Sequence, residues 1–365
     1  MISILAYIAL LFLGLRVLVV ITNFLFHLLL RNYEASDAQN ISVLIPARNE
    51  EKNIARLLDG LMGLEQKNLE IVVCDDHSTD RTPAILAEYT KQHRAIRWFR
   101  GDELKPGWTG KNYACHQLAG KANGEILLFV DADMELSGDF ISGMAGFMKK
   151  QRLALLSIFP KQLLLSFGEK ATVPVMNWIL LSLLPLPMVI FSSRSSFSAA
   201  NGQFMMFRAN TYHKLQPHSI VRSSAVEDID IMRLYKNDRY RCATLPGDNR
   251  ARCRMYTGYR EAVAGFSKNI LHFFSGSLVW LFFYIFFTTF GLLFIGLLSF
   301  PLLLASVFAA LLCRVMISRI SHQNILNNLL LVPVQHFSFL HMVFAALVQR
   351  STGSLEWKGR KVQLK

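Results

Sequence analysis

The segment LLFVDADMELS, residues 127–137, joins a strongly apolar run directly to two carboxylates. Residues 127–130 are typical of a β-strand that is buried on both faces. Asp131 and Asp133 follow, with a single residue between them. Two carboxylates at the mouth of such a strand repel each other and resist the loss of hydration, so the sequence predicts a positively charged partner at this point.

Similar apolar runs alternate with helical patterns along the polar part of the chain. We expect strands at 41–46, 70–76, 96–101 and 125–133, and helices at 50–64, 84–92 and 111–121. The first of these helices carries Ile54, Leu57, Leu58 and Leu61 on one face. This alternation predicts an α/β fold with a mostly parallel central sheet covered on both faces.

Polar residues follow the expected strands at the points where the strands end. They are Arg48, Asn49, Glu50, Asp75, Asp76, Asp131 and Asp133. Ligands of open parallel sheets bind beyond the carboxyl ends of the strands, so we expect these side chains to face one crevice. Clustered carboxylates favour a hard divalent cation that also holds a phosphate group. The alternative for the D-x-D pair is one helix cap and one solvated carboxylate. The region has no dinucleotide-binding fingerprint and no P-loop.

Long apolar segments lie near both ends of the chain. Residues 1–30 have the length of a bilayer-spanning helix, and we interpret them as an uncleaved anchor rather than a signal peptide. The block 271–313 is long enough for two spans, and the block 325–347 either spans or lies in the interface. Residues 173–191, broken by prolines, are expected to form an interfacial segment.

These segments predict four regions. They are an N-terminal transmembrane anchor at 1–30, a cytoplasmic catalytic domain at 36–269, a C-terminal membrane region at 271–348 and a basic cytoplasmic tail at 349–365. A cytoplasmic tail requires an even number of crossings after the catalytic domain. This favours a hairpin of two spans and a third block that does not cross.

The formal net charge is +13, but the placement of the basic residues argues against nucleic acid as a partner. Many lie beside the apolar blocks: Arg31, Arg250, Arg252, Arg254, Arg260, Lys268, Arg314, Arg319, Lys358, Arg360, Lys361 and Lys365. Such positions are typical of the cytoplasmic side of a membrane with an anionic surface. We therefore predict a multi-pass protein of the cell membrane. The cysteines lack metal-ligand spacing and are interpreted as small buried residues or incidental thiols of a reducing compartment: Cys74, Cys115, Cys242, Cys253 and Cys313.

Six motifs occur in a fixed order between the hydrophobic ends: SVLIPARNEEKNIARLL, VVCDDHSTDRT, GWTGKNYACHQLA, LLFVDADMEL, AANGQFMMFR and VEDIDIMRLYK. Together they resemble family 2 glycosyltransferases over roughly residues 40–270. The resemblance is strongest to the membrane-attached branch that includes carotenoid- and hopanoid-associated enzymes. It implies the GT-A nucleotide-diphosphosugar fold and inversion of the anomeric centre by direct displacement.

The resemblance also implies how a donor is bound. Pro46, Ala47 and Glu50 stand where the family contacts the uracil side of the donor. Asp76 stands where the family binds the base or the ribose. Lys111 either reaches a phosphate or caps a solvated helix start.

The acidic motifs correspond to the metal and acceptor sides of the family's site. Asp131 and Asp133 match the D-x-D pair that holds Mg²⁺ or Mn²⁺ against the diphosphate. Glu227 and Asp228 match an acidic pair whose second member is the general base, and an acidic helix N-terminus is the alternative. Gly202 either lets a backbone approach the sugar or acceptor, or forms a turn. An acceptor hydroxyl needs such a base, because its pKa lies far above neutrality.

No Q-x-x-R-W motif of processive synthases follows Asp228, which favours a single transfer. We predict an inverting, metal-dependent glycosyltransferase that moves one sugar from a nucleotide diphosphosugar, with a UDP-sugar favoured, to a membrane-resident, lipid-like acceptor. The alternatives are a polyprenyl-phosphate sugar transferase and a catalytically silent membrane scaffold with the same fold.

Overall fold

The computed structural model describes residues 1–29, 40–64, 68–352, 356–357 and 360–361. The chain divides into two compact units. The sheet unit comprises Leu29–Lys161 and Met188–Arg254, and the helical unit comprises Met1–Leu28, Gln162–Pro187 and Met255–Lys365. Three of the predicted juxtamembrane basic residues lie outside the described residues: Arg31, Lys358 and Lys365. Much of the predicted tail at 349–365 also lies outside them.

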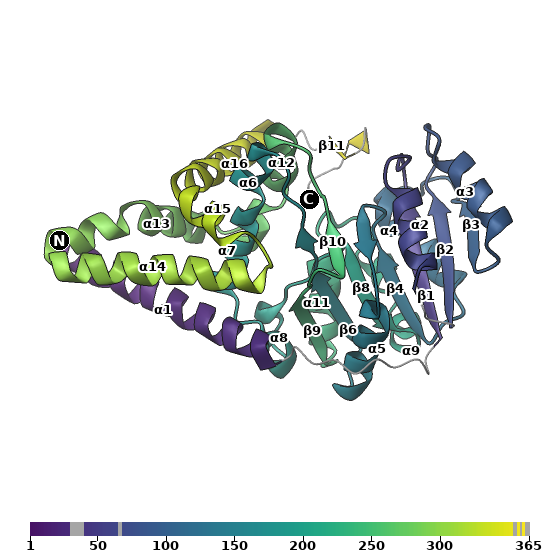
Figure 1. Ribbon diagram of the computed structural model, residues 1–365, viewed down its shortest axis with the longest axis horizontal. Helices are drawn as coiled ribbons and strands as arrows, with labels where there is room; N and C mark the ends of the chain where they lie inside the picture. The colour runs from purple at the N-terminus through teal and green to yellow at the C-terminus, as the bar shows by residue number, and fades with distance from the viewer. Residues whose placement is uncertain (30–39, 65–67, 353–355, 358–359, 362–365) are drawn as a thin grey trace. The chain divides into compact units, whose positions relative to one another are not determined.

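The sheet unit is built on seven strands in the order β3-β2-β1-β4-β8-β6-β9 (Figure 1). The strands are β1 Ile41–Ala47, β2 Leu69–Asp75, β3 Ile96–Arg100, β4 Ile126–Val130, β6 Leu155–Phe159, β8 Phe204–Arg208 and β9 Cys242–Pro246. All run parallel except β8, which is antiparallel to both of its neighbours. The predicted α/β fold with a mostly parallel central sheet is confirmed.

Helices connect these strands. Those of the sheet unit are α2 Ile54–Met62, α3 Thr82–Gln92, α4 Gly110–Gly120, α5 Phe140–Lys150, α9 Ala209–Leu215, α10 Pro217–Ile220 and α11 Glu227–Asn237, with the 3₁₀ turn η1 Ser195–Phe197. The short elements β7 Lys161–Gln162 and α8 Pro187–Phe191 lie where the chain passes between the units. The apolar face predicted for α2 is buried at all four of its positions.

The strand β4 is shorter than the predicted range 125–133. It ends at Val130, and a hydrogen bond of 3.1 Å from the Met134 N–H to the Asp131 carbonyl closes a turn over the D-x-D pair. After this turn the chain continues into β5, Met134–Leu136, which pairs antiparallel with β10, Ala251–Cys253. The two carboxylates therefore project from a turn rather than from an extended strand.

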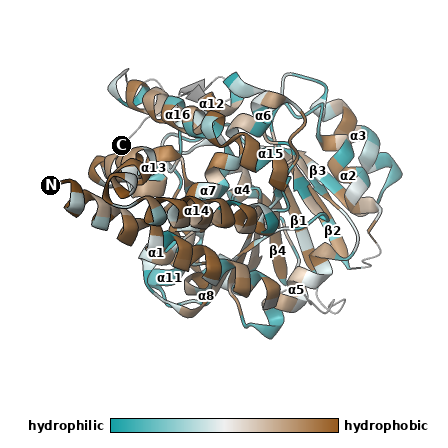
Figure 2. Ribbon diagram, turned by 60° about the vertical axis from the view of Figure 1, so that its left-hand side comes forward, coloured by the Kyte–Doolittle hydropathy of each residue, from teal (hydrophilic) through white to brown (hydrophobic). Residues whose placement is uncertain are grey.

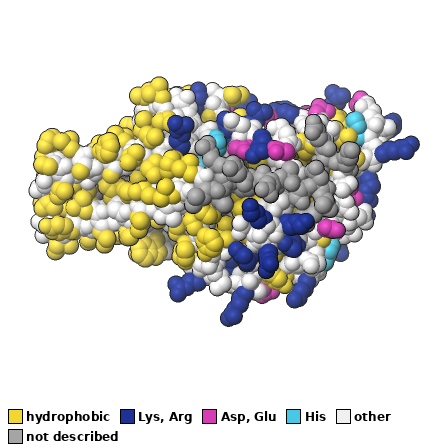
Figure 3. Space-filling view, turned by 60° about the horizontal axis from the view of Figure 1, so that its bottom comes forward, with side chains coloured by type: hydrophobic (Ala, Val, Ile, Leu, Met, Phe, Trp, Pro, Cys, Tyr) yellow, Lys and Arg dark blue, Asp and Glu magenta, His cyan; other side chains and the backbone are white. Residues whose placement is uncertain are grey.

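The helical unit contains α1 Ile2–Leu29, α6 Phe167–Thr172, α7 Pro174–Leu183, α12 Tyr259–Ser267, α13 Leu278–Leu298, α14 Phe300–Ile320, α15 Ile325–Leu330 and α16 Val332–Thr352, with the 3₁₀ turn η2 Ile270–Phe274. The hairpin β11 Glu356–Trp357 and β12 Arg360–Lys361 follows. Among the described residues, four helical stretches are long and apolar enough to cross a membrane: Ile2–Leu28, Leu278–Leu298, Phe300–Ile320 and Val332–Ser351. Figure 2 shows α1, α13 and α14 as largely hydrophobic, and hydrophobic side chains dominate their visible surface in Figure 3.

Two details refine the membrane prediction. The second apolar block turns at Ser299, so α13 and α14 form a hairpin. The third block lies in α15 and α16, and α16 has the length for a fourth crossing. The number of crossings therefore stays a prediction.

The proline-broken segment 173–191 forms two short helices, α7 and α8, rather than one that could span a bilayer. Within the helical unit, Trp178 and Leu181 of α7 pack against Val20 of α1 and Ile317 of α14. Its interfacial position remains a prediction.

Asn23 of α1 binds the backbone where α7 ends. Its side-chain Nδ2 donates to the carbonyls of Leu181 and Leu184, at 2.9 Å each. Its Oδ1 accepts from the Leu186 N–H at 2.6 Å. Asn23 is fully buried, so its amide satisfies three backbone groups at a helix end away from water.

Candidate functional site

The ends of β1 and β2 bring the predicted nucleoside-side residues together. Ala47 pairs with Asp75, and the Asp76 N–H donates to the Ala47 carbonyl at 2.8 Å. Arg48 Nη1 donates to the Asp76 carbonyl at 2.6 Å and lies 3.8 Å from the Asp76 carboxylate. Pro46 precedes them on β1. The Asp76 side chain is therefore held at the sheet edge by its backbone and by a neighbouring cation.

Glu50 lies between β1 and α2, in the turn that leads into the helix. Its N–H donates to Thr82 Oγ1 at 2.8 Å, and its carboxylate accepts from Asn53 Nδ2 at 2.9 Å. Burial, followed by the charges of Asp131 and Glu50, raises the pKa of Asp133 to about 6. Glu50 therefore lies within electrostatic reach of the D-x-D pair, on the same edge of the sheet.

The strand β8 explains how the AANGQF motif reaches this edge. It runs antiparallel to β4, with Phe204 opposite Val130. The Asp131 N–H donates to the Gln203 carbonyl at 3.1 Å, just beyond the paired strands. The register therefore places Gly202 and Gln203 beside the two aspartates.

Lys111 lies at the centre of the acidic cluster. Its Nζ is 2.9 Å from Asp131 Oδ2 and 3.3 Å from Glu227 Oε1, and it donates to the Gly202 carbonyl at 3.4 Å. Burial acts to lower the pKa of Lys111, but the charges of Asp131 and Glu227 outweigh it and hold the pKa well above its ordinary value. Lys111 is therefore a permanent positive charge shared by Asp131 and Glu227.

Asp228 stands in the first turn of α11, and backbone donors orient its carboxylate. The Gly202 N–H donates to Oδ2 at 3.0 Å, and the Ile229 N–H donates to Oδ1 at 2.8 Å. Burial, followed by the negative charge of Glu227, raises the pKa of Asp228 to about 7. A carboxyl group with this pKa exchanges a proton near neutral pH, as a general base must.

Asp133 is held by two residues that sequence analysis does not single out. Gln203 Nε2 donates to its two carboxylate oxygens at 3.2 and 3.4 Å, and Cys253 Sγ donates to Oδ2 at 3.2 Å. Cys253 is fully buried, and it reaches this point because β10 pairs with β5, with Cys253 opposite Met134. Interpreting Cys253 as an incidental thiol therefore misses a contact. Its sequence surroundings carry no signal for that contact, since a non-local pairing creates it.

The two aspartates fit a divalent cation. Mutual repulsion contributes to the raised pKa of Asp133, and a hard cation would offset that repulsion. In the part of the chain that the structure describes, no group of three or more His, Cys, Asp or Glu side chains is placed to hold a metal ion. Asp131 and Asp133 could therefore supply part of a coordination shell, with oxygens of a bound diphosphate and water completing it.

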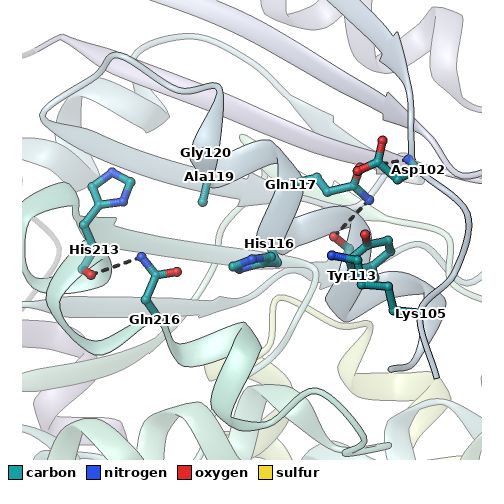
Figure 4. Close-up of a pocket in the computed structure, with 9 residues that line it drawn as sticks. All are labelled: Asp102, Lys105, Tyr113, His116, Gln117, Ala119, Gly120, His213 and Gln216. Atoms are coloured by element: carbon teal, nitrogen blue, oxygen red, sulfur yellow. Dashed lines mark hydrogen bonds between the residues drawn. The ribbon is translucent and has the colours of Figure 1, made fainter. Parts of the chain in front are cut away.

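A pocket of about 340 Å³ lies beside α4, which supplies several of its lining residues (Figure 4). Its lining residues are Asp102, Lys105, Tyr113, His116, Gln117, Ala119, Gly120, His213 and Gln216. Within it, Gln117 accepts from the Asp102 N–H at 2.9 Å, and Gln216 donates to the His213 carbonyl at 3.1 Å. The predicted site residues do not line this pocket, so it is separate from the acidic cluster.

Replacing Gly202 with alanine should disturb the cluster without unfolding the protein. A Cβ at this position would lie 3.1 Å from Lys111 Nζ and 3.2 Å from Glu227 Oε1, so both charged groups must shift by a few tenths of an ångström. We expect turnover to fall on the order of tenfold, because misplacement of reacting groups is costly. Gly120→Ala, where nothing lies within 4 Å, is the matched control. Equal activity of the two variants would contradict the placement of Gly202 within a site that turnover requires.

Comparison with known proteins gives a family match and several relatives. The model of Glycosyl transferase family 2 matches residues 42–212. Over 246 residues the chain is 28% identical to 4,4'-diaponeurosporenoate glycosyltransferase of Staphylococcus haemolyticus, covering 65% of this chain and 62% of that protein. Over 120 residues it is 32% identical to beta-monoglucosyldiacylglycerol synthase of Nostoc, covering 32% of this chain and 25% of that protein.

Among solved structures, the fold is similar to a mannosyltransferase from Pyrobaculum calidifontis in complex with GDP-Man and Mn²⁺. The two chains share 15% identity with a TM-score of 0.56, and the alignment covers 95% of this chain and 99% of the other. At this identity the likeness concerns the fold alone.

Proposed function

Because residues 42–212 form a family 2 glycosyltransferase domain with a GT-A-like fold, we propose that the chain transfers one sugar from a nucleotide diphosphosugar to a lipid-like acceptor, with inversion. The observation that carries this proposal is the acidic cluster around Lys111, with Asp131 on one side and Glu227, followed by Asp228, on the other. The side with Asp131 suits a departing diphosphate, and the side with Glu227 and Asp228 suits an acceptor.

The acceptor class is supported by the names of the relatives and by the apolar helices. One relative is named for a carotenoid acid and the other for a diacylglycerol product, so both names point to membrane lipids. Four helical stretches suited to crossing a membrane would keep the enzyme beside such an acceptor. We propose a multi-pass protein of the cell membrane with its catalytic unit on the cytoplasmic side. The donor would be a UDP-sugar, bound between Pro46, Ala47 and Asp76.

In the proposed mechanism, Asp228 accepts the proton of the acceptor hydroxyl while the bond from that oxygen to the anomeric carbon forms and the bond from this carbon to the diphosphate breaks. The N–H groups of Gly202 and Ile229 fix the direction of its carboxylate before the substrate arrives. This orientation reduces the reorganisation that the transition state requires. Burial, followed by the charge of Glu227, keeps the pKa of Asp228 high, and Lys111 limits that increase.

On the leaving-group side, Asp131 and Asp133 would hold Mg²⁺ or Mn²⁺. Such an ion, when bound, neutralises negative charge that develops on the departing nucleoside diphosphate. Gln203 and Cys253 fix the Asp133 carboxylate, and Lys111 fixes that of Asp131. These contacts place both carboxylates before the donor binds.

A direct test is to incubate the purified chain, in lipid, with labelled nucleotide sugars and a membrane lipid extract. We expect the label to move into the lipid fraction, with a UDP-sugar as the best donor. The product should gain a single hexose-sized mass by mass spectrometry. Label that stays entirely in the aqueous fraction for all donors would contradict the proposed acceptor class.

The transfer rate should depend on pH in a definite direction. Only the deprotonated form of Asp228 can accept a proton, and its pKa is raised to about 7. We therefore expect kcat/KM to increase as the pH rises through about 7 and to level off above it. A profile of kcat/KM at saturating metal measures this change. A rate that is constant or falls over this range would be incompatible with Asp228 as the base.

A further inference from the structure

Two arginines lie inside the candidate membrane spans of the helical unit. Arg16 is in the middle of α1, and Arg314 is in the second half of α14. Ionisable residues inside a membrane segment are costly, and they usually have partners or a function. The contacts of both residues can be followed within the helical unit.

Arg16 is bound by uncharged groups. Its Nε donates to Ser182 Oγ at 3.2 Å, and its Nη2 donates to the Tyr284 hydroxyl at 3.4 Å. Its guanidinium also lies over the rings of Phe12 and Tyr284, at 5.5 and 5.2 Å from their centroids. These contacts orient the group but leave its charge uncompensated.

Arg314 has the same kind of environment. Its Nη1 donates to Gln335 Oε1 at 2.6 Å and to the Asn328 carbonyl at 3.4 Å. Its guanidinium stacks on Trp178, with Cζ 3.2 Å from the ring centroid. Gln335 is itself fixed by Asn328 and by the Lys170 carbonyl, at 3.0 Å each. The side chain of Arg314 is therefore held in one place by neutral partners.

The two guanidinium groups contact the same side of α7. Trp178 and Ser182 are four residues apart in α7, so they lie on one side of that helix. Arg314 contacts the first and Arg16 the second. The two positive charges are close enough to interact electrostatically. Like charges held together in an apolar bundle create a positive potential that an anion would relieve.

No carboxylate compensates this charge among the described residues, where neither arginine takes part in an ion pair. Each guanidinium has five N–H donors. Two are used by the bonds given above, which leaves three on each arginine without a protein acceptor in the described part of the chain. Both side chains are partly exposed. Donors therefore remain for a ligand that carries several acceptor oxygens.

We propose that Arg16 and Arg314 form a binding site for the anionic head group of a membrane lipid. Their position favours a lipid over a soluble anion. Tyr284 lies six residues after the start of α13, and Arg314 lies six residues before the end of α14, about 9 Å along each helix. The guanidinium group of Arg16 shares this depth through its contact with Tyr284. At this depth, long arginine side chains can extend toward the head-group region. This inference does not rest on the proposed sugar transfer.

The test uses the full chain in lipid nanodiscs without nucleotide sugar. Thermal unfolding and lipid retention in native mass spectrometry are compared between phosphatidylcholine alone and phosphatidylcholine with phosphatidylglycerol. We expect the anionic lipid to be retained and to raise Tm. Arg16→Gln and Arg314→Gln should each weaken its retention by about tenfold, because each removes charge-assisted hydrogen bonds.

Two further variants keep the test decisive. Arg319→Gln removes a charge from the exposed last turn of the same helix α14 and should leave retention unchanged. Arg314→Lys keeps the charge and should restore part of the retention even if the glutamine variant is unstable. Equal retention by the wild type and both Arg→Gln variants would overturn the site. A Tm increase with inorganic phosphate in phosphatidylcholine as large as that with the anionic lipid would overturn the lipid assignment.

Discussion

Asp228→Asn should reduce the rate of sugar transfer by about three orders of magnitude, the scale that a general base contributes. Asparagine has nearly the same shape, but it cannot accept a proton at neutral pH. The asparagine amide nitrogen cannot accept a hydrogen bond, so one of the N–H donors of Gly202 and Ile229 loses its acceptor, but loss of the charge itself should cost little stability. Burial and the neighbouring Glu227 already raise the pKa of Asp228 to about 7, so an uncharged side chain is tolerated at this position. Single-turnover measurements at saturating donor separate this loss from any change in donor affinity.

Asp230→Asn is the matched control for that experiment. Asp230 stands in the same first turn of α11, but it binds Ser224 Oγ at 2.7 Å and Arg233 at 3.1 Å. We expect its activity to stay within about twofold of wild type, since exposed ion pairs contribute little. Near-normal turnover of Asp228→Asn would favour an acceptor that is already ionised, such as the phosphate of the polyprenyl-phosphate alternative, because such an oxygen needs no base.

Asp133→Asn should lower transfer by about 10²–10³-fold, because metal ions supply several kcal/mol of charge stabilisation. Its stability should be equal to or higher than that of wild type. The substitution removes a partly buried carboxylate whose pKa is raised to about 6 by burial and by Asp131. Binding of Mn²⁺ to the protein with nucleoside diphosphate, followed by electron paramagnetic resonance, should weaken in parallel with activity.

Asp139→Asn serves as the control for the proposed metal site. Its carboxylate is 60% exposed and pairs with Arg250 at 2.6 Å, outside the acidic cluster. We expect metal binding and turnover to be unaffected. If Asp133→Asn binds Mn²⁺ as well as this control does, the assigned ligand is wrong. If neither wild type nor control hydrolyses or transfers a nucleotide sugar with metal present, the catalytically silent scaffold becomes the better hypothesis.

Local sequence patterns were sufficient for the first half of the sheet unit. Ile54, Leu57, Leu58 and Leu61 have the spacing of one helical face, and all are buried. Strand bounds differ from the predicted ones by a few residues at most, the largest difference being the end of β4 at Val130. These elements are stabilised by contacts between neighbours in sequence, so the pattern of apolar residues carries the information.

The contacts of the site depend on pairings that no local pattern encodes. Gln203 and Cys253 reach Asp133 only because β8 pairs with β4 and β10 pairs with β5. The contacts of Arg250 and Arg252 were also not predictable from their local sequence. Their positions in the sequence predict a juxtamembrane role, whereas they form ion pairs with Asp248 and Glu135 in the sheet unit, at 2.7 and 3.0 Å.

The division into units also differs from the linear order of the sequence. Residues 162–187 and 255–269 fall in the predicted catalytic domain, yet they belong to the helical unit by contacts. Val173 and Ile179 pack with Val263 of α12 and with Met342 of α16 in one apolar cluster. Apolar segments that are far apart in sequence assemble in this way, so the boundaries at 36 and 269 stay predictions.

The amide of Asn23 gives α1 a structural role beyond anchoring the chain in a membrane. Three backbone groups around residues 181–186 depend on this one side chain, at distances of 2.6 to 2.9 Å. An unrelated apolar helix of equal hydropathy grafted in place of α1 would still enter a bilayer. It would leave those groups without partners in apolar surroundings. Chimeras of this protein should therefore keep its own α1, and membrane insertion alone is not a sufficient measure of their integrity.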